Sequence, residues 1–431
     1  MLSAFGKAFK TPDLRKKIFF TLSIMALFRF GSVVPTPGVS YKNVQECLTQ
    51  VQSGGLFGLI NLFSGGALLK LSVFALGIMP YITSSIIIQL LTVVIPRFEA
   101  LKQEGQSGSA KLTQYTRYLT IGLAILQTTA LIAVARTPGR LIAGCSLPII
   151  PDTSWQRIIT MIFVMTAGTA VIMWLGELIT DRGIGNGMSI LIFTSIAASF
   201  PSNLWSIQRT KGWFAFLFVI AVGILVIMAV VFVEQAQRRI PVQYAKRMIG
   251  RREYGGTTTY IPIKVNQAGV IPVIFASSLL YIPSLVVNFT NSQAAWAVWI
   301  SRNLVKGDHP IYIAAYAALI IFFTYFYVAI TFNPEEVADN MKKYGGFIPG
   351  IRAGRPTTEY LQYVLSRITA PGSLYLALVA VIPIFALILF GATQNFPFGG
   401  TSILIVVGVG LDTAKQIESQ LQQRSYEGFL R

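Results

Sequence analysis

The sequence has few charged residues. Only 12% of its 431 residues are Asp, Glu, Lys or Arg, whereas 53% are hydrophobic and the mean hydropathy is +0.61. A soluble protein of this size would need a much more charged surface to stay dispersed. The apolar residues also come in blocks of about 15 to 25, the length of a membrane-spanning helix. The composition therefore predicts membrane spans with loops rather than several soluble domains.

Histidine and cysteine are almost absent. The chain has one histidine, His309, and two cysteines, Cys47 and Cys145. These provide no grouped set of metal ligands and no Cys/His nucleophile pair at helical spacing. The sequence also lacks a GxxxxGK[ST] phosphate-binding loop. We therefore expect no enzymatic activity, no metal and no cofactor, and the sequence leaves open whether the two cysteines pair.

Ionisable residues are also rare within the apolar blocks. Arg29 is the clearest example, and Glu177 and Asp412 lie close to the ends of two blocks. A proton- or ion-coupled carrier usually holds acidic groups at the membrane midplane, so their scarcity argues against such a carrier. We interpret Arg29 as structural, either snorkelling to the interface or capping a helix-end carbonyl.

Ten apolar blocks predict ten membrane spans. Eight are strong, at Ile18–Val34, Leu71–Ile95, Tyr118–Ala135, Ile158–Leu178, Trp213–Val233, Gly269–Val287, Ile311–Thr331 and Ser373–Ala392. Met188–Phe200 is weaker because it is short and contains Ser and Thr. Thr401–Ala414 is weaker because it loses its apolar character at Asp412 and continues as a polar helical stretch. The first block has no small-residue cleavage site close after it, so we expect a retained helix.

The distribution of positive charge predicts the orientation. Ten spans place both termini on the same side of the membrane. With that assignment, 25 of the 35 Lys and Arg residues lie on the terminal side, nine lie opposite, and Arg29 lies in the first span. The side richer in Lys and Arg is the cytoplasmic side, so both termini are predicted to be cytoplasmic. The net charge of +18 therefore does not indicate a nucleic-acid-binding domain.

The spans divide into two equal groups at a break near Pro201–Lys211. This division gives an N-terminal half, residues 1–205, and a C-terminal half, residues 206–431. Because five is odd, two halves that share a fold must have opposite orientations, as in an inverted repeat whose interface holds a transport path. The predicted fold is therefore an all-α polytopic membrane protein of two inverted five-helix halves. This arrangement also fits a secondary transporter.

A short apolar segment, Gly54–Gly66 (GGLFGLINLFSGG), precedes the second span. A helix of this length rises only about 20 Å, which is too short for a membrane core of about 30 Å. One reading is a re-entrant or plug helix within a cavity, with the flanking glycines as hinges. The other reading is a loop helix that rests on the external interface.

Isoleucines recur at helical spacing in several predicted spans. They include Ile82 and Ile86 in the second span, Ile192 in the fifth, and Ile271 and Ile274 in the seventh. Gln89 lies one turn deeper than Ile86 on the same face. Isoleucines at this spacing most often face lipid or fill the packing between helices, so periodicity alone predicts no pore.

Two predicted cytoplasmic loops, residues 234–266 and 333–371, are long and basic. Both exceed 30 residues, which is longer than a simple connection requires. Positive-inside bias and contact with anionic lipids explain part of their charge. Their length, with Gly and Pro near the tips, favours paired docking projections for an acidic motor surface or ribosomal RNA. The arginines expected to dock are Arg238, Arg239, Arg247, Arg251, Arg252, Arg352 and Arg355.

Six strings, in order along nearly the whole chain, resemble the SecY family, which includes the α subunit of the endoplasmic reticulum translocon. They are FSGGALLKLSVFALGIMPYITSSIIIQLL (Phe63–Leu91), RGIGNG (Arg182–Gly187), QRRIPVQYAKR (Gln237–Arg247), KVNQAGVIPVIFASS (Lys264–Ser278), GIRAG (Gly350–Gly354) and GGTSILIVV (Gly399–Val407). The resemblance implies an hourglass-shaped channel between the two halves, closed by a plug and by an isoleucine-rich constriction. Such a ring excludes water and ions by dewetting and deforms around a peptide.

The resemblance also implies roles for particular residues. The plug comprises Leu56, Phe57, Leu59, Ile60, Asn61, Leu62 and Phe63. The pore ring comprises Ile82, Ile86, Ile192, Ile271, Ile274 and Ile405. A lateral gate lies where the second and third spans face the seventh and eighth, with Gln89 and Asn266 as polar candidates. Asn266 has a second reading as a cap of the seventh helix.

Two positions depart from the family pattern. Ala353 follows Arg352, the loop arginine associated with function in the family, at a position where the family usually has proline. The tip of this loop is therefore expected to be less rigid. Met188 occupies a position next to the ring that the family often fills with isoleucine, so we do not expect a uniform isoleucine ring.

The resemblance implies a channel subunit of the Sec translocase that passes unfolded secretory proteins and releases membrane helices sideways. The implied partners are the small subunits SecE and SecG, the SecA ATPase, the ribosome through its RNA, signal peptides, nascent secretory proteins and anionic lipids. The implied location is the bacterial inner membrane. The alternative is a polytopic secondary transporter, and a purely structural scaffold would not explain the plug-like segment.

Overall fold

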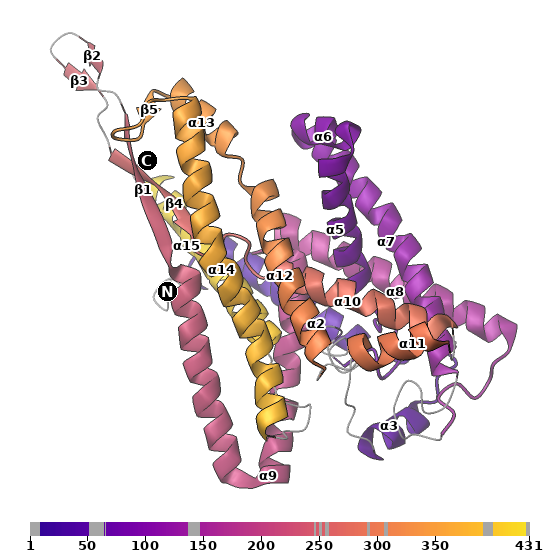
Figure 1. The fold of residues 1–431 in the computed structure, drawn as a ribbon. Helices are drawn as coiled ribbons and strands as arrows, with labels where there is room; N and C mark the ends of the chain where they lie inside the picture. The colour runs from indigo at the N-terminus through magenta and orange to yellow at the C-terminus, as the bar shows by residue number, and fades with distance from the viewer. Residues whose placement is uncertain are drawn as a thin grey trace.

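The protein is a bundle of long helices with a β-structure projecting from one end (Figure 1). The computed structural model describes residues 9–50, 64, 66–136, 147–244, 247–249, 252–254, 258–290, 294–305, 309–390 and 400–427. Prolines mark many of the helix starts, because a proline in the first turn leaves no additional N–H without a partner. Examples are Pro12, Pro80 and Pro310.

The described residues of the first part of the chain form six helices, with a sharp bend between two of them. They are α2 (Pro12–Gly31), α3 (Tyr41–Gln50), α5 (Met79–Val94), α6 (Pro96–Gln103), α7 (Gln106–Ala135) and α8 (Trp155–Arg182). Ile95 is extended because it precedes Pro96, and α5 and α6 bend by 100° at this point. The polar helix α6 therefore turns away from the apolar helix α5.

The second predicted span is shorter than expected, because helix α5 begins at Met79 rather than at Leu71. Residues 66–78 form successive turns, and Leu71 has a left-handed backbone with φ of 46°. Leu68, Leu71 and Ala75 are buried in this segment. Non-helical backbone at membrane depth is tolerated where protein surrounds it, and this burial supplies that condition.

Helix α9 (Gly187–Gln235) combines two predicted spans. The Asn186 side chain caps its start by accepting hydrogen bonds from the N–H groups of Met188 and Ser189 at 3.1 and 3.3 Å. The helix continues through Pro201 and reverses direction at Gly212, where φ is 82°. The turn lies at Gly212, directly after the range Pro201–Lys211 near which the break was predicted, and the left-handed backbone of a glycine makes it.

The second part of the chain contains the remaining helices. They are α10 (Ile271–Thr290), α11 (Ala295–Ile300), the π-helical turn η1 (Ser301–Val305), α12 (Pro310–Thr331), α13 (Pro334–Lys343), α14 (Arg355–Phe390) and α15 (Gly400–Glu427). The single histidine has a structural role here, because His309 Nδ1 accepts a hydrogen bond from the N–H of Ile311 at the start of α12. Asn333 caps α13 in the same way.

Each of the ten predicted spans overlaps a described helix. Within the described residues, five segments are individually long and apolar enough to cross a membrane: Gln106–Ala135, Trp155–Arg182, Gly212–Gln235, Pro310–Lys343 and Arg355–Ile382. The bent pair α5–α6 is a sixth candidate, and Gly187–Pro201 and Ile271–Leu280 are shorter apolar helices. Helix α15 runs on to Glu427, which confirms the polar helical extension beyond Asp412.

The two long loops fold together into one sheet. Strands β1 (Gln237–Tyr244) and β4 (Thr258–Lys264) form an antiparallel hairpin, with β2 (Arg247–Ile249) and β3 (Arg252–Tyr254) paired at its tip. The short strand β5 (Gly346–Phe347), which comes from the other loop, pairs with the opposite edge of β1. The loops are therefore connected by backbone pairing, which the sequence did not predict.

The two ends of the bundle carry different connections. Figure 1 places α6, α13 and the strands at one end, and α3 and the bend of α9 at the other end. Leu14 of α2 packs with Ile417 of α15 and with Ile184, just before α9. The start of the first span and the end of the last span therefore lie together, as an even number of spans requires.

Candidate functional site

Three of the six predicted pore-ring residues lie together between the halves. Ile192 of α9, Ile274 of α10 and Ile405 of α15 belong to one buried cluster. Ile82 of α5 is partly buried and packs against the same cluster. Four separate helices thus direct isoleucine side chains to one apolar junction.

The other two predicted ring residues, Ile86 and Ile271, belong to an adjoining cluster. Ile86 is buried with Val273 and Phe275, while Ile271 is partly buried against them. Ile82 contacts both clusters, so it links the two groups of isoleucines. The structure therefore brings the six residues into two adjacent clusters at the junction of the halves.

Sequence reasoning missed some members of this junction. Ile78 and Ile196 are buried in the same cluster as Ile192, although no motif singled them out. Met188 is partly buried beside them, and its Sδ lies 2.5 Å from the position of a Cβ added at Gly176. Met188 therefore packs closely on α8 at Gly176.

The predicted plug residues, Leu56 to Phe63, lie outside the described part of the chain. The structure does describe the segment that follows them. Ser64 is buried, and its Oγ accepts a hydrogen bond from the N–H of Leu68 at 3.0 Å. A Cβ added at Gly168 of α8 would lie 2.1 Å from the Val73 carbonyl oxygen, so α8 approaches this segment closely. The chain beyond the plug segment is thus firmly packed.

The helices predicted to form a lateral gate are in contact. Helix α10 packs against both α5 and α7, and it also packs against α12. Ser84 of α5 donates a hydrogen bond to the Thr116 carbonyl of α7 at 2.7 Å, so α5 and α7 are joined on the other side of the gate. The two sides of the predicted gate are therefore packed against each other in this structure.

The two polar gate candidates have different environments. Gln89 is partly buried on α5, and its backbone carbonyl accepts a hydrogen bond from the Thr92 hydroxyl. Asn266 is buried, and its Nδ2 donates to Glu234 Oε1 at 2.6 Å and to the Gly269 carbonyl at 3.2 Å. The capping interpretation of Asn266 is wrong, because its Oδ1 accepts no hydrogen bond from the described residues.

The predicted docking arginines are distributed over both loops. Arg238 and Arg239 are exposed on β1, and Arg352 and Arg355 are exposed near the start of α14. Arg355 forms an ion pair with Glu359 at 3.1 Å. Two further arginines lie on the tip strands, Arg247 on β2 and Arg252 on β3, while Arg251 is outside the described residues.

A shared hydrophobic core holds these loops in place. Ile240 and Val242 of β1 and Ile263 of β4 are buried together with Met341 of α13 and Leu361 of α14. The exposed arginines are therefore carried by a packed platform rather than by separate loops. The length and charge of the loops predicted a docking face, but nothing in the sequence predicted this common core.

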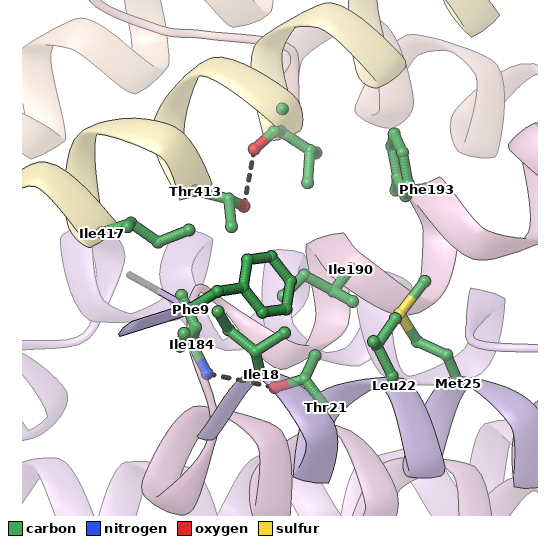
Figure 2. Close-up of a pocket in the computed structure, with 12 residues that line it drawn as sticks. Phe9, Ile18, Thr21, Leu22, Met25, Ile184, Ile190, Phe193, Thr413 and Ile417 are labelled. Atoms are coloured by element: carbon green, nitrogen blue, oxygen red, sulfur yellow. Dashed lines mark hydrogen bonds between the residues drawn. The ribbon is translucent and has the colours of Figure 1, made fainter. Parts of the chain in front are cut away.

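An open apolar cavity of about 300 Å³ lies between α2, α9 and α15. In Figure 2, α15 carries Thr413 and Ile417 on one side, and α2 carries Leu22 and Met25 on the other. Thr21 accepts a hydrogen bond from the N–H of Ile184, which fixes the loop before α9 to α2. Helices from both halves thus line one apolar groove.

Cys47 and Arg29 have structural positions. Cys47 is fully buried against Leu68 and Leu71 and is disulfide-bonded. Cys145, whose pairing the sequence left open, lies outside the described residues. Arg29 lies in the last turn of α2, where a cation is favoured by the helix dipole.

The described residues contain no group of three His, Cys, Asp or Glu side chains arranged to hold a metal ion. The structure combines an apolar junction between the two halves, packed helices at the predicted gate and a basic platform at one end. This combination matches the architecture expected of a membrane channel.

Comparison with known proteins places this arrangement in a family. A family model described as SecY matches residues 72–414. The protein translocase subunit SecY of Streptomyces galbus is 70% identical, and that of Mycobacterium tuberculosis strain H37Rv is 60% identical, each over 100% of both chains. A solved protein-conducting channel has a TM-score of 0.64 at 18% identity, covering 94% of this chain and 91% of that one.

A second solved structure, Sec61 in the canine ribosome–channel complex, has a TM-score of 0.60 at 17% identity, covering 94% of this chain and 91% of that one. The fold is thus that of the protein-conducting channels. The chain belongs to the SecY family. It is a channel subunit of a protein translocase and not an enzyme, and the transporter alternative finds no support.

Proposed function

We propose that this chain passes unfolded secretory proteins across the bacterial inner membrane and releases membrane helices through the gate between α5, α7, α10 and α12. The observation that carries the proposal is the junction of Ile192, Ile274 and Ile405 between the halves. Both termini are cytoplasmic, because the described ends of α2 and α15 lie on the side that bears most of the positive charge.

The isoleucine junction acts as the seal of the channel. A constriction lined only by branched aliphatic side chains holds no water, so ions find no hydrated path through it. The isoleucine side chains belong to separate helices, so they can move apart. A passing extended polypeptide then takes the place of the contacts between them. The plug residues Leu56 to Phe63 close the external side of this constriction in the resting channel.

The gate discriminates between secreted and membrane-inserted segments. A signal peptide or an apolar nascent segment gains free energy by leaving the channel for lipid, whereas a polar segment does not. Opening separates α10 from α5 and α7, which are in contact in this structure. No group in this process forms or breaks a covalent bond, so the driving force comes from a partner.

The partner that supplies force docks on the cytoplasmic sheet. Arg238, Arg239 and Arg352 are exposed on a platform that a common hydrophobic core makes rigid. Two similar solved structures, Sec61 in the canine ribosome–channel complex and the yeast Ssh1 complex bound to the 80S ribosome, support docking of a ribosome. The SecA ATPase uses the same platform through its acidic surface.

The small membrane subunits SecE and SecG complete the channel. The groove between α2, α9 and α15 is apolar, open and built by both halves, which suits one membrane helix of SecE. Gly410 lies on this groove, and a Cβ added there would meet no heavy atom within 4 Å, so a partner helix can approach closely. Exposed Arg15 and Lys16 at the start of α2 contact anionic lipids.

Depletion of the protein in its own cells tests this function. Precursors with intact signal peptides should accumulate in the cytoplasm within a few generations, while small-solute uptake continues. Reintroducing the wild-type chain should restore export. Normal export after depletion would contradict the proposed function.

A further inference from the structure

The neck of the β1–β4 hairpin is closed by a buried polar pair. Glu234 lies in the last turn of α9, and Asn266 lies just after β4. Asn266 Nδ2 donates a hydrogen bond to Glu234 Oε1 at 2.6 Å, and the two residues are only 3% and 9% exposed. The Val265 N–H also donates to the Ala236 carbonyl at 3.0 Å. The two ends of the hairpin are therefore fixed to each other.

The same neck is fixed to two helices of the second half. A Cβ added at Gly372 of α14 would lie 2.4 Å from the Val265 carbonyl oxygen, so the two backbones are in close contact. Lys264 Nζ lies 3.6 Å from Asp412 Oδ1 of α15. The neck therefore packs closely on α14 and has an additional exposed ion pair to α15.

The buried pair of Glu234 and Asn266 reduces the free energy of unfolding if its only role is to stabilise the fold. A buried carboxylate loses its hydration, and the Asn266 Oδ1 atom is buried without a hydrogen-bond partner among the described residues. Apolar side chains of similar size would close the neck at lower cost. A requirement for directed hydrogen bonds explains why polar residues are found there.

Asn266 also controls the start of the gate helix. Its Nδ2 donates a second hydrogen bond to the Gly269 carbonyl at 3.2 Å, two residues before α10 begins. Gly269 has a left-handed backbone with φ of 62°, and a Cβ there would meet no heavy atom within 4 Å. The backbone angle alone therefore favours glycine here, with asparagine the residue that tolerates it next best, and open space surrounds the joint.

We propose that Glu234 and Asn266 form the fixed pivot of α10, and that Gly269 is the hinge about which α10 swings away from α5 and α7. A partner docked on the sheet thereby moves the gate helix, because the hairpin neck and the helix start share one anchor. Both residues are positioning residues, since neither contacts the passing polypeptide. The inference rests on the proposed docking role of the sheet.

Two disabling substitutions and two conservative ones test the pivot. Glu234→Leu removes the acceptor and introduces an apolar side chain of similar size, and Gly269→Ala disfavours the left-handed backbone of the hinge without a steric clash. Glu234→Gln keeps an oxygen that accepts from Asn266, and Gly269→Asn keeps a residue that tolerates a left-handed backbone. Spin labels at the exposed residues Ile125 of α7 and Leu279 of α10 report the distance across the gate.

The complete translocase complex is measured with and without ribosomes that carry a signal-bearing nascent chain. In the wild type, docking should lengthen the distance between the labels. Glu234→Leu and Gly269→Ala should bind ribosomes with an affinity within about twofold of wild type. In both variants the distance between the labels should not increase on docking, and the transport rate should fall at least fivefold. Glu234→Gln and Gly269→Asn should behave as wild type.

Two results overturn the pivot alone. One is normal gate opening in both disabling variants, and the other is equal impairment of the conservative and disabling variants. If Glu234→Leu does not fold, the comparison of gate opening in Gly269→Ala with gate opening in Gly269→Asn tests the proposal. A wild-type complex that binds no ribosome would instead overturn the docking function, and the pivot with it.

Discussion

Gln243 of β1 is paired with Phe347 of β5, and this pairing joins two cytoplasmic loops that are separated by about one hundred residues of sequence. The neighbouring pair, Tyr244 and Gly346, continues the contact. A Cβ at Gly346 would lie 3.1 Å from the Tyr244 ring and 3.3 Å from Val242 Cγ1. The two loops therefore form a single docking surface whose closure depends on a small residue.

Gly346→Leu should separate the loops. The larger side chain cannot fit between Tyr244 and Val242, so β5 should detach from β1 while the membrane helices stay folded. Hydrogen exchange of both loops should rise at least tenfold, and limited proteolysis should cut them faster. Tyr344→Ala, at an exposed residue in the same loop, is the matched control. Unchanged exchange in Gly346→Leu would show that the pairing does not hold the loops together.

Reversing the charge at the tip of the second loop should impair transport without disrupting assembly. Arg352→Glu should reduce ATP-driven translocation into reconstituted vesicles several-fold, because an exposed cation that faces a docked partner is replaced by an anion. The control is Lys102→Glu, at an exposed cation of α6 that is not among the predicted docking residues. Complex assembly is followed by size-exclusion chromatography. Equal transport by Arg352→Glu and wild type would exclude a docking role for this residue.

The ion pair between α7 and α8 should contribute measurably to stability. Arg117 Nε and Nη2 lie 2.9 Å from the two carboxylate oxygens of Glu177, a bidentate geometry. Because the arginine side chain is 42% exposed and the glutamate 22%, we expect a coupling of only about 1 kcal/mol. A double-mutant cycle of Arg117→Gln and Glu177→Gln in denaturant titrations measures it. Additive effects of the two substitutions would mean that the pair contributes nothing.

Shortening a side chain of the isoleucine junction should make the channel leak. Ile405 is 1% exposed among Ile192 and Ile274, so Ile405→Gly leaves a gap that neighbouring helices cannot fill completely. Ion conductance of vesicles containing the resting channel should rise several-fold. Ile405→Val removes one methylene and should leak much less. A tight seal in Ile405→Gly would show that this junction is not the barrier.

Much of the fold could be predicted from the sequence because the membrane imposes simple requirements. Apolar blocks such as Trp213–Val233 and Ile311–Thr331 identify their helices directly, since every backbone group must find a partner within the span. The start of α5 was misplaced because residues 71–78 are as apolar as a helix. Hydropathy reflects how apolar a segment is, so it cannot distinguish a buried non-helical turn, such as that at Leu71, from a buried helix.

The site was less predictable than the fold. Isoleucine spacing did not identify the junction, because Ile274 and Ile405 meet only through tertiary packing, and the family resemblance supplied their roles. The hydrogen bond between Asn266 and Glu234 joins residues 32 positions apart, so no local pattern indicates it. The pairing of β1 with β5 was missed for the same reason, since two strand residues carry almost no sequence signal.

The path of a secretory protein through the junction is the central claim, and site-directed crosslinking tests it most directly. Single cysteines at Ile86, Ile274 and Ile405 are compared with one at Phe163, a residue of α8 that is 72% exposed on the outer surface of the bundle. A secretory precursor stalled halfway through the membrane carries a thiol-reactive crosslinker. Crosslinks at the three junction positions, with none at Phe163, are expected. Equal labelling at all four positions, or labelling at Phe163 alone, would contradict the account.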